Sequence, residues 1–175
     1  MHGRLSGVDI GRINGLTQAE FIGLLGGIFE NSPWVAEQAW HMRPFDDLDA
    51  IHQGMAEVAK NAPREWQLRL LRSHPDLAGR EAQEGKMTDS STVEQASAGL
   101  NALSRAEMDE INQLNAEYRR KHGFPFIIAV REHTKPGIFM EFRRRLGNNT
   151  ETEVENALQQ IFAITLLRIR ALECT

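Results

Sequence analysis

The hydrophobic and polar positions of this chain recur with helical spacing over most of its length. Between residues 18 and 29, apolar side chains fall three and four positions apart, and the same spacing returns over residues 46–60 and 64–74. Side chains at that spacing share one face of an α-helix. The pattern therefore predicts a series of helices that each bury one apolar stripe.

Capping signals indicate where several of these helices begin and end. In a capping box, a Ser or Thr and a Glu three residues later both bond to backbone N–H groups at the start of a helix. Gly123 follows a long helical pattern, at a position where glycine commonly ends a helix. Four pairs have capping-box spacing: Thr17 with Glu20, Ser91 with Glu94, Ser104 with Glu107, and Thr150 with Glu153.

One apolar segment departs from the helical pattern. Residues 124–130, FPFIIAV, have a strand-like composition, but no second segment of this kind is available to pair with them. We expect them to form a buried, irregular connector. Residues 80–90 are polar without periodicity and predict a loop, and TKPG at 134–137 predicts a turn. The expected fold is all-α, a single domain over residues 13–175 with about seven or eight helices, after a flexible leader over residues 1–12.

Charge and composition exclude several classes of partner. A formal net charge of -4 argues against nucleic-acid binding, which favours a basic surface. The basic runs at residues 119–121 and 143–145 lie among acidic residues and are interpreted as solvated helix faces. No apolar run approaches the roughly 20 residues of a membrane span. Cys174 is the only cysteine, so a disulfide within the chain is excluded, which fits a reducing, cytoplasmic location.

His74 directly precedes a proline at the predicted end of a helix. The residue before a proline is held in extended geometry, so this imidazole is attached to a stiff backbone. Histidine also has an ordinary pKa suited to proton transfer near neutrality. A cationic side chain at a helix C-terminus is, however, stabilised by the helix dipole alone. The pattern leaves both roles open.

Glu94 and Arg131 are the two charged residues that His74 could work with. The spacing from Ser91 favours a capping role for Glu94, whereas a carboxylate facing His74 would fix the imidazole tautomer and raise its pKa. Arg131, at the polar end of the connector, could clamp a carboxylate or pair with a surface acid. Connector backbone groups that lack a sheet partner could face a ligand. No metal-ligand or nucleotide-binding motif occurs in the sequence, so no metal is expected.

Four motifs in this order resemble those of one enzyme family. They are SHPDLAG at residues 73–79, S-x-x-E-Q-x-x-A-G-L at 91–100, GFPFIIAVR at 123–131 and EFRRRLGNNTETEVENAL at 141–158. Together they resemble the 2-oxo-4-hydroxy-4-carboxy-5-ureidoimidazoline (OHCU) decarboxylases of urate breakdown. The similarity extends over residues 12–173.

The resemblance implies an all-α, homodimeric enzyme that decarboxylates OHCU to (S)-allantoin without a cofactor. It makes His74 the catalytic histidine and Glu94 its acidic partner. Ser97 and His122 depart from the glycine and phenylalanine frequent in the family, which bears on the dimensions of the pocket. The implied substrate contacts are Pro75, Ser91, Gln95, Phe126, Ile127, Ile128, Ala129, Val130 and Arg131.

Two other functions stay open at this point. A helical interaction module could keep the fold without activity, although such a module has no need of His74, Glu94 and Gln95 together. A cofactor-independent enzyme acting on another ureido acid is the second alternative. Freshly made OHCU tests the first function, because only that enzyme converts it to one enantiomer of allantoin. Faster decay of another substrate would indicate the other enzyme, and no effect on either substrate would indicate the module.

Overall fold

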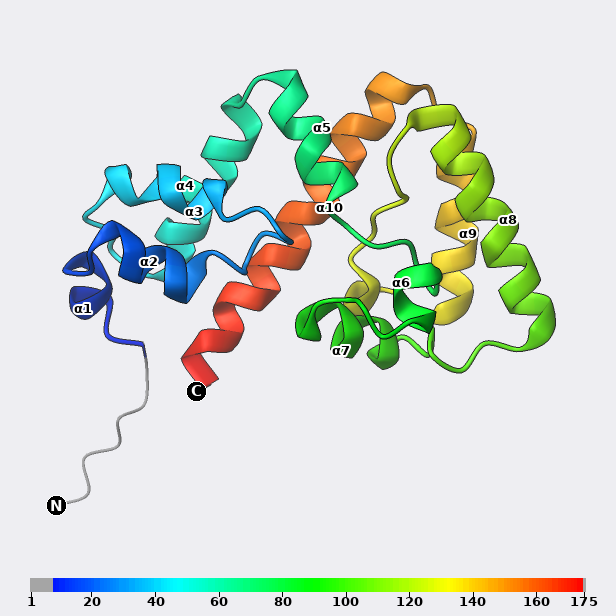
Figure 1. Cartoon of the computed structure of the whole chain (residues 1–175), viewed down its shortest axis with the longest axis horizontal. Helices are drawn as coiled ribbons and strands as arrows, with labels where there is room; N and C mark the ends of the chain where they lie inside the picture. The colour runs from blue at the N-terminus through cyan, green and yellow to red at the C-terminus, as the bar shows by residue number, and fades with distance from the viewer. Residues whose placement is uncertain (1–7, 175) are drawn as a thin grey trace, which may run out of the picture. The chain divides into compact units, whose positions relative to one another are not determined.

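The computed structural model describes residues 8–174, and its regular structure is entirely helical (Figure 1). Within that range ten α-helices and three short 3₁₀ turns occur and no strand, which confirms the all-α prediction. Two compact units make up the chain. The first unit comprises Met1–Leu70 and Phe162–Thr175, and the second unit comprises Leu71–Ile161. Of the leader expected over residues 1–12, residues 1–7 lie outside the described residues, and the helix α1 begins within the rest, at Ile10.

The first unit packs its helices around buried aromatic and aliphatic side chains. Ile51 and Met55 of the predicted 46–60 stripe are fully buried, whereas Trp66 is 39% exposed and contacts the ring of Trp34 edge-on instead of pointing inward. Asp9 caps a short helix that the sequence pattern did not reveal. The elements are α1 Ile10–Asn14, α2 Gln18–Leu25, α3 Trp34–Ala39, η1 Trp40–Met42, α4 Leu48–Asn61, α5 Arg64–Arg72, the end of α10 Thr150–Arg170, and η3 Ala171–Cys174.

The second unit is centred on a cluster of aromatic rings. The ring of Phe126 stacks on that of Phe142 at 3.9 Å, and Tyr118 meets both rings edge-on. These three side chains join the buried connector to the helices on either side of it. The elements are α6 Arg80–Gln83, α7 Asp89–Ser97, α8 Arg105–His122, η2 Val130–Glu132, α9 Lys135–Leu146, and α10 as far as Ile161.

Two of the four predicted capping boxes are present in the structure. The boxes at Thr17 and Ser104 are present, and Gly123 ends α8 in the left-handed conformation, as predicted. The box at Ser91 is absent, because α7 begins earlier and Thr88 caps it. At α10, the Asn149 side chain accepts from the N–H of Thr152, so Thr150 is not the cap.

Two predicted irregular segments contain helix. Residues 80–83 of the expected loop form α6, a single turn. The TKPG sequence is the start of α9, with Thr134 as the cap and a proline in the first turn, where a missing N–H costs nothing. Among residues 8–174, no helix is both long and apolar enough to cross a membrane.

Candidate active site

His74 lies where α5 ends, at the start of a loop that continues to Gly79. Its backbone N–H donates to the carbonyl of Leu71 at 3.3 Å, and its side chain is buried, with the residue 6% exposed. Pro75, the next residue, is half-buried. The predicted helix end before the proline is therefore confirmed. A cation that only closed a helix would lie in solvent, so burial of the imidazole favours a role inside a site.

The loop that follows His74 has a constrained backbone. Ala78 is buried with a φ of 47°, in the left-handed region that residues with a Cβ rarely adopt. A Cβ added at Gly79 would lie 2.6 Å from the Cβ of Asp76, so a side chain does not fit there without a shift. Strain of this kind persists only where surrounding structure holds it, and it is common at functional sites.

Gln95 of α7 holds this loop through both ends of its side-chain amide. Its Oε1 accepts a hydrogen bond from the N–H of Ala78 at 2.9 Å, and its Nε2 donates to the carbonyl of Asp76 at 3.2 Å. Gln95 is 5% exposed. Buried backbone groups need partners, and here one side chain satisfies two of them. The contacts fix α7 against the loop that begins at His74.

Helix α8 holds the same loop from another direction. Asn115 donates from Nδ2 to the carbonyl of Leu77 at 2.9 Å. Arg119 Nε lies 3.0 and 3.1 Å from the two carboxylate oxygens of Asp76. Burial raises the pKa of Asp76, while the Arg119 cation opposes that shift. The loop after His74 is thus fixed by side chains from two helices.

Ser91 and Glu94 lie on α7 beside Gln95. Ser91 is buried, Glu94 is half-buried, and the two are three positions apart on neighbouring parts of one helix face. Because Thr88 is the N-cap, Glu94 lies in the helix interior and its capping role is excluded. The carboxylate of Glu94 is therefore carried on the helix that packs against the His74 loop.

The connector at residues 124–130 starts next to the same loop. Arg72, two residues before His74, donates from Nε to the carbonyl of Gly123 at 3.0 Å. The next seven residues are all buried and have no regular structure before η2, as predicted. At the other end of the connector, α7 packs against η2. The His74 loop, α7 and the connector therefore lie together in the second unit.

The connector leaves several of its backbone donors unused. Arg145 Nη1 donates to the carbonyl of Ile127 at 2.7 Å, and Gln160 Oε1 accepts from the N–H of Ala129 at 3.0 Å. No hydrogen bond from the N–H groups of Phe126, Ile127 or Ile128 occurs among the residues that the structure describes. Buried N–H groups without an acceptor are rare in proteins, and a ligand oxygen can satisfy them.

Arg131 differs from the other predicted site residues in its exposure. It is exposed and belongs to η2, beyond the buried part of the connector. Val130 precedes it and is 6% exposed. A contact between the Arg131 guanidinium and a substrate stays a prediction.

A buried ion pair between Arg145 and Glu153 lies beside the connector and is bonded to it through the Ile127 carbonyl. Glu153 of α10 accepts from Arg145 Nε at 2.9 Å and from the Tyr118 hydroxyl at 2.7 Å. Asn148 and Asn156 donate to its other oxygen. Burial favours the protonated carboxyl, but these hydrogen bonds and the Arg145 cation outweigh it and lower the pKa of Glu153. Burial also raises the pKa of Tyr118, which stays a donor.

Sequence reasoning missed these supporting side chains. The interpretation of residues 143–145 as a solvated face is wrong for Arg145, which is 2% exposed. Spacing could have indicated that Arg145 is buried. Arg145 lies three residues after Phe142 and seven after Ile138, both buried, and residues at that spacing share a helix face. Asn115 and Gln160 carried no comparable signal.

An apolar cavity of about 240 Å³ borders the His74 loop and α7. Ala78 and Gln95 contribute to its wall, together with the apolar side chains of Leu100 and Met108. In the part of the chain that the structure describes, the cavity included, no group of three or more His, Cys, Asp or Glu side chains could hold a metal ion.

The sequence and the fold match one family. A family model described as OHCU decarboxylase matches residues 14–170. A 2-oxo-4-hydroxy-4-carboxy-5-ureidoimidazoline decarboxylase of Haloferax volcanii is 40% identical over 158 residues, covering 90% of this chain and 92% of that protein.

Two solved structures have a similar fold. The structure of an (S)-allantoin synthase aligns with a TM-score of 0.75 and 28% identity, over 94% of this chain and 54% of the other. The structure of an OHCU decarboxylase in the presence of (S)-allantoin aligns with a TM-score of 0.66 and 22% identity, over 81% of this chain and 92% of the other.

Proposed function

Because this chain belongs to the OHCU decarboxylase family, we propose that it removes carbon dioxide from OHCU to give (S)-allantoin, as a step of urate degradation. OHCU carries a carboxylate and a hydroxyl on one ring carbon, beside a C=N bond. When the bond to the carboxylate breaks, its electron pair passes toward the imine nitrogen. The substrate thus supplies the electron sink that decarboxylation requires.

His74 is the proposed acid–base group. In this proposal, its imidazole takes the hydroxyl proton of OHCU or delivers a proton to the enol-like intermediate, at the ring carbon that belonged to the C=N bond. Delivery to one face of the ring gives a single enantiomer. A buried imidazole at the start of a fixed loop suits this role, since its direction of approach does not vary. General acid–base catalysis typically contributes about 10² to 10⁴ in rate.

Glu94 is the proposed partner of His74. A carboxylate beside an imidazole fixes the tautomer of the ring and raises its pKa. The capping interpretation of Glu94 no longer competes with this one, because Thr88 caps α7 and Glu94 lies inside the helix. Its helix is also the one that Gln95 joins to the His74 loop.

The connector is proposed to bind the oxygens of the substrate through its backbone. The unused N–H groups of Phe126, Ile127 and Ile128 are donors fixed in a buried segment. Fixed donors can orient a substrate so that the departing carboxylate lies perpendicular to the ring, and orientation alone can lower a barrier substantially. Pro75, Ser91 and Gln95 would contribute the facing wall, and Arg131 the rim.

One observation carries the proposal. The loop after His74 is held by α7 and α8 beside a buried connector, in which the N–H groups of Phe126, Ile127 and Ile128 meet no acceptor among residues 8–174. The test is to supply freshly generated OHCU and follow its ultraviolet decay together with the circular dichroism of the allantoin formed. Accelerated decay to one enantiomer supports the assignment. Decay at the uncatalysed rate, giving racemic allantoin, would refute it.

A homodimer and a cytoplasmic location belong to the same proposal. Both come from the family resemblance and the single cysteine. Light scattering on the purified chain tests the first, with a mass of twice 19.8 kDa as the expected result. Fractionation of the source cells tests the second.

A further inference from the structure

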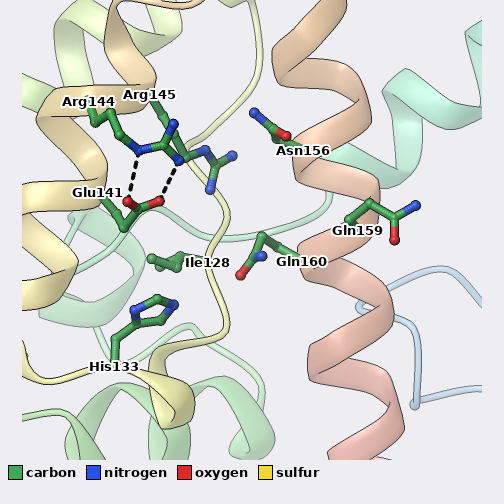
Figure 2. A pocket seen from close by; sticks show the side chains of 8 residues that line it. All are labelled: Ile128, His133, Glu141, Arg144, Arg145, Asn156, Gln159 and Gln160. Carbon is green, nitrogen blue, oxygen red and sulfur yellow. Dashed lines mark hydrogen bonds and ion pairs between the residues drawn. The ribbon is translucent and has the colours of Figure 1, made fainter.

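A second cavity, of about 100 Å³, lies in the second unit between α9, α10 and the connector (Figure 2). Glu141, Arg144 and Arg145 of α9 line it on one side, and Asn156 and Gln160 of α10 on the other. The mechanism proposed above uses none of these side chains as an acid, a base or a substrate contact. A water molecule needs about 30 Å³, so the cavity exceeds the size of a single water site.

Arg145 brings an unsatisfied donor to this cavity. Its side chain is 3% exposed, and two of its guanidinium nitrogens are occupied by Glu153 and by the carbonyl of Ile127. The third, Nη2, is buried and meets no acceptor among the residues that the structure describes. Figure 2 shows the Arg145 guanidinium extending from α9 toward α10 and Gln160.

The carboxylates nearby are already fully engaged. Arg144 donates to both oxygens of Glu141, at 2.8 and 2.7 Å. Both oxygens of Glu153 accept hydrogen bonds, one from Arg145 and the other from Asn156. The two carboxylates therefore offer no unused oxygen to a cation, while Arg145 Nη2 still needs an acceptor.

Gln160 supplies a second donor. Its Oε1 accepts from the N–H of Ala129, and no hydrogen bond from its Nε2 occurs within the described residues. Because both lone donors come from residues on opposite sides of one cavity, a single ligand with two acceptor oxygens can reach both. A carboxylate offers two such oxygens in one plane, which suits the planar edge of a guanidinium.

We propose that this cavity binds a small carboxylate anion, held by Arg145 Nη2 and Gln160 Nε2. The same two side chains hold the Ile127 carbonyl and the Ala129 N–H of the connector. Occupancy of the cavity is therefore transmitted to the segment proposed to bind OHCU. Ile128 is the one residue that lines this cavity and also belongs to the proposed substrate site. The existence of the cavity does not depend on the decarboxylase assignment.

The binding test uses acetate as the probe and the Nε–H resonance of Arg145 as the readout. Titration of ¹⁵N-labelled protein with sodium acetate should move this resonance along a saturable curve, and sodium chloride at equal ionic strength should not. Sodium phosphate, a tetrahedral anion, should bind more weakly. The amide resonances of Ile128 and Ala129 should shift with the same midpoint, because the peptide group of Ile128 contains the Ile127 carbonyl bonded to Arg145 and the Ala129 N–H is bonded to Gln160.

Two Gln→Glu variants supply the matched comparison. Gln160→Glu keeps an acceptor for the Ala129 N–H but replaces the donor Nε2 with a negatively charged oxygen. Gln38→Glu makes the same charge change on an exposed side chain of α3, which does not line the cavity. Loss of a charge-assisted bond predicts about 10- to 100-fold weaker acetate binding for Gln160→Glu only.

Three results would overturn the proposal. They are a linear, unsaturated shift with acetate, an equal response to chloride, or equal weakening by the two variants. The first would mean that Arg145 Nη2 is satisfied by water alone. The wild-type titration distinguishes saturable binding from these results even if Gln160→Glu fails to fold.

Discussion

Gln95 Oε1 accepts a hydrogen bond from the N–H of Ala78 at 2.9 Å, across the contact between α7 and the His74 loop. Ala78 is the residue of that loop with a positive φ, so the bond stabilises the backbone where it is most strained. The other end of the amide holds the carbonyl of Asp76. Gln95 therefore fixes the backbone of the loop that begins at His74, and we predict that it positions His74 in this way.

Replacement of Gln95 by Met should lower kcat/KM by tenfold or more, because it leaves two buried backbone groups of the loop unsatisfied. The expected cost in the free energy of unfolding is about 1–3 kcal/mol. Steady-state kinetics and urea denaturation measure the two effects. Gln113→Met is the control, since Gln113 is exposed and, among residues 8–174, its side chain bonds only to Glu117. Normal kcat/KM in folded Gln95→Met would contradict the positioning role.

Gly79→Ala should displace the loop at its other end. The new Cβ would overlap that of Asp76 at 2.6 Å, and relief requires a backbone shift costing about 1–3 kcal/mol. Activity should fall with stability. Gly23→Ala on α2 is the control, because nothing lies within 4 Å of an added Cβ there. In that exposed helix the change should stabilise by about 0.5–1 kcal/mol. Thermal melts of both variants measure the difference. Equal melting temperatures for the two variants would contradict the prediction.

Glu153→Gln should weaken the protein most near neutral pH and least in acid. The pKa of Glu153 is lowered in the folded state, so its ionised form contributes stability above the ordinary glutamate pKa of about 4.3. That contribution disappears as pH falls through the lower folded pKa. Breaking a buried pair also leaves Arg145 uncompensated, at about 3–5 kcal/mol.

Denaturation across the acid range measures the Glu153 effect. The free energies of wild type and Glu153→Gln should converge as pH falls. Glu155→Gln, two residues along α10 on an exposed side chain, should follow wild type throughout. A constant gap between wild type and Glu153→Gln at every pH would show that the carboxylate charge is not what stabilises the pair.

His122→Phe should change how stability depends on pH between about 5 and 7. Burial lowers the pKa of His122, so the unfolded chain binds a proton there that the folded chain resists. Folded wild type therefore loses stability as pH falls through the ordinary histidine pKa of about 6.5. The Nε2 of His122 is buried and has no partner within the described residues. A phenylalanine ring removes this unsatisfied polar atom, but it also removes the bond to Thr150.

The free energy of unfolding of His122→Phe should rise relative to that of wild type as the solution becomes more acidic. Urea denaturation at a series of pH values measures it. His41→Gln, at an exposed histidine of the first unit, is the comparison and should show no such trend. A gap between His122→Phe and wild type that does not vary with pH would contradict a lowered pKa of His122 in the folded state.

Local signals in the sequence were sufficient for most of the helices. Capping at Ser104 and termination at Gly123 depend on residues a few positions apart, so both were predictable. The start of α7 was missed because Thr88 and Ser91 are both residue types that cap helices, and in the structure Thr88 is the cap. Spacing cannot rank two such candidates.

The sequence supplied candidate acid–base residues, but not the side chains that hold the surrounding backbone in place. His74 and Glu94 were identified by residue type and by resemblance. Asn115 and Arg145 were not, because their partners are backbone carbonyls 38 and 18 positions away. A polar side chain buried on an amphipathic helix is hard to distinguish in a sequence from one in solvent. Only the folded chain reveals which carbonyl it reaches.

A double-mutant cycle on kcat/KM tests most directly whether His74 and Glu94 act as one acid–base unit. His74→Asn should lower kcat/KM by about 10² to 10⁴ while leaving the circular dichroism unchanged. Glu94→Gln should lower it too, and the double variant should be no slower than His74→Asn alone, because residues that act as a unit are not additive. Independent, multiplying losses, or a folded His74→Asn variant with near-normal turnover, would contradict the pairing.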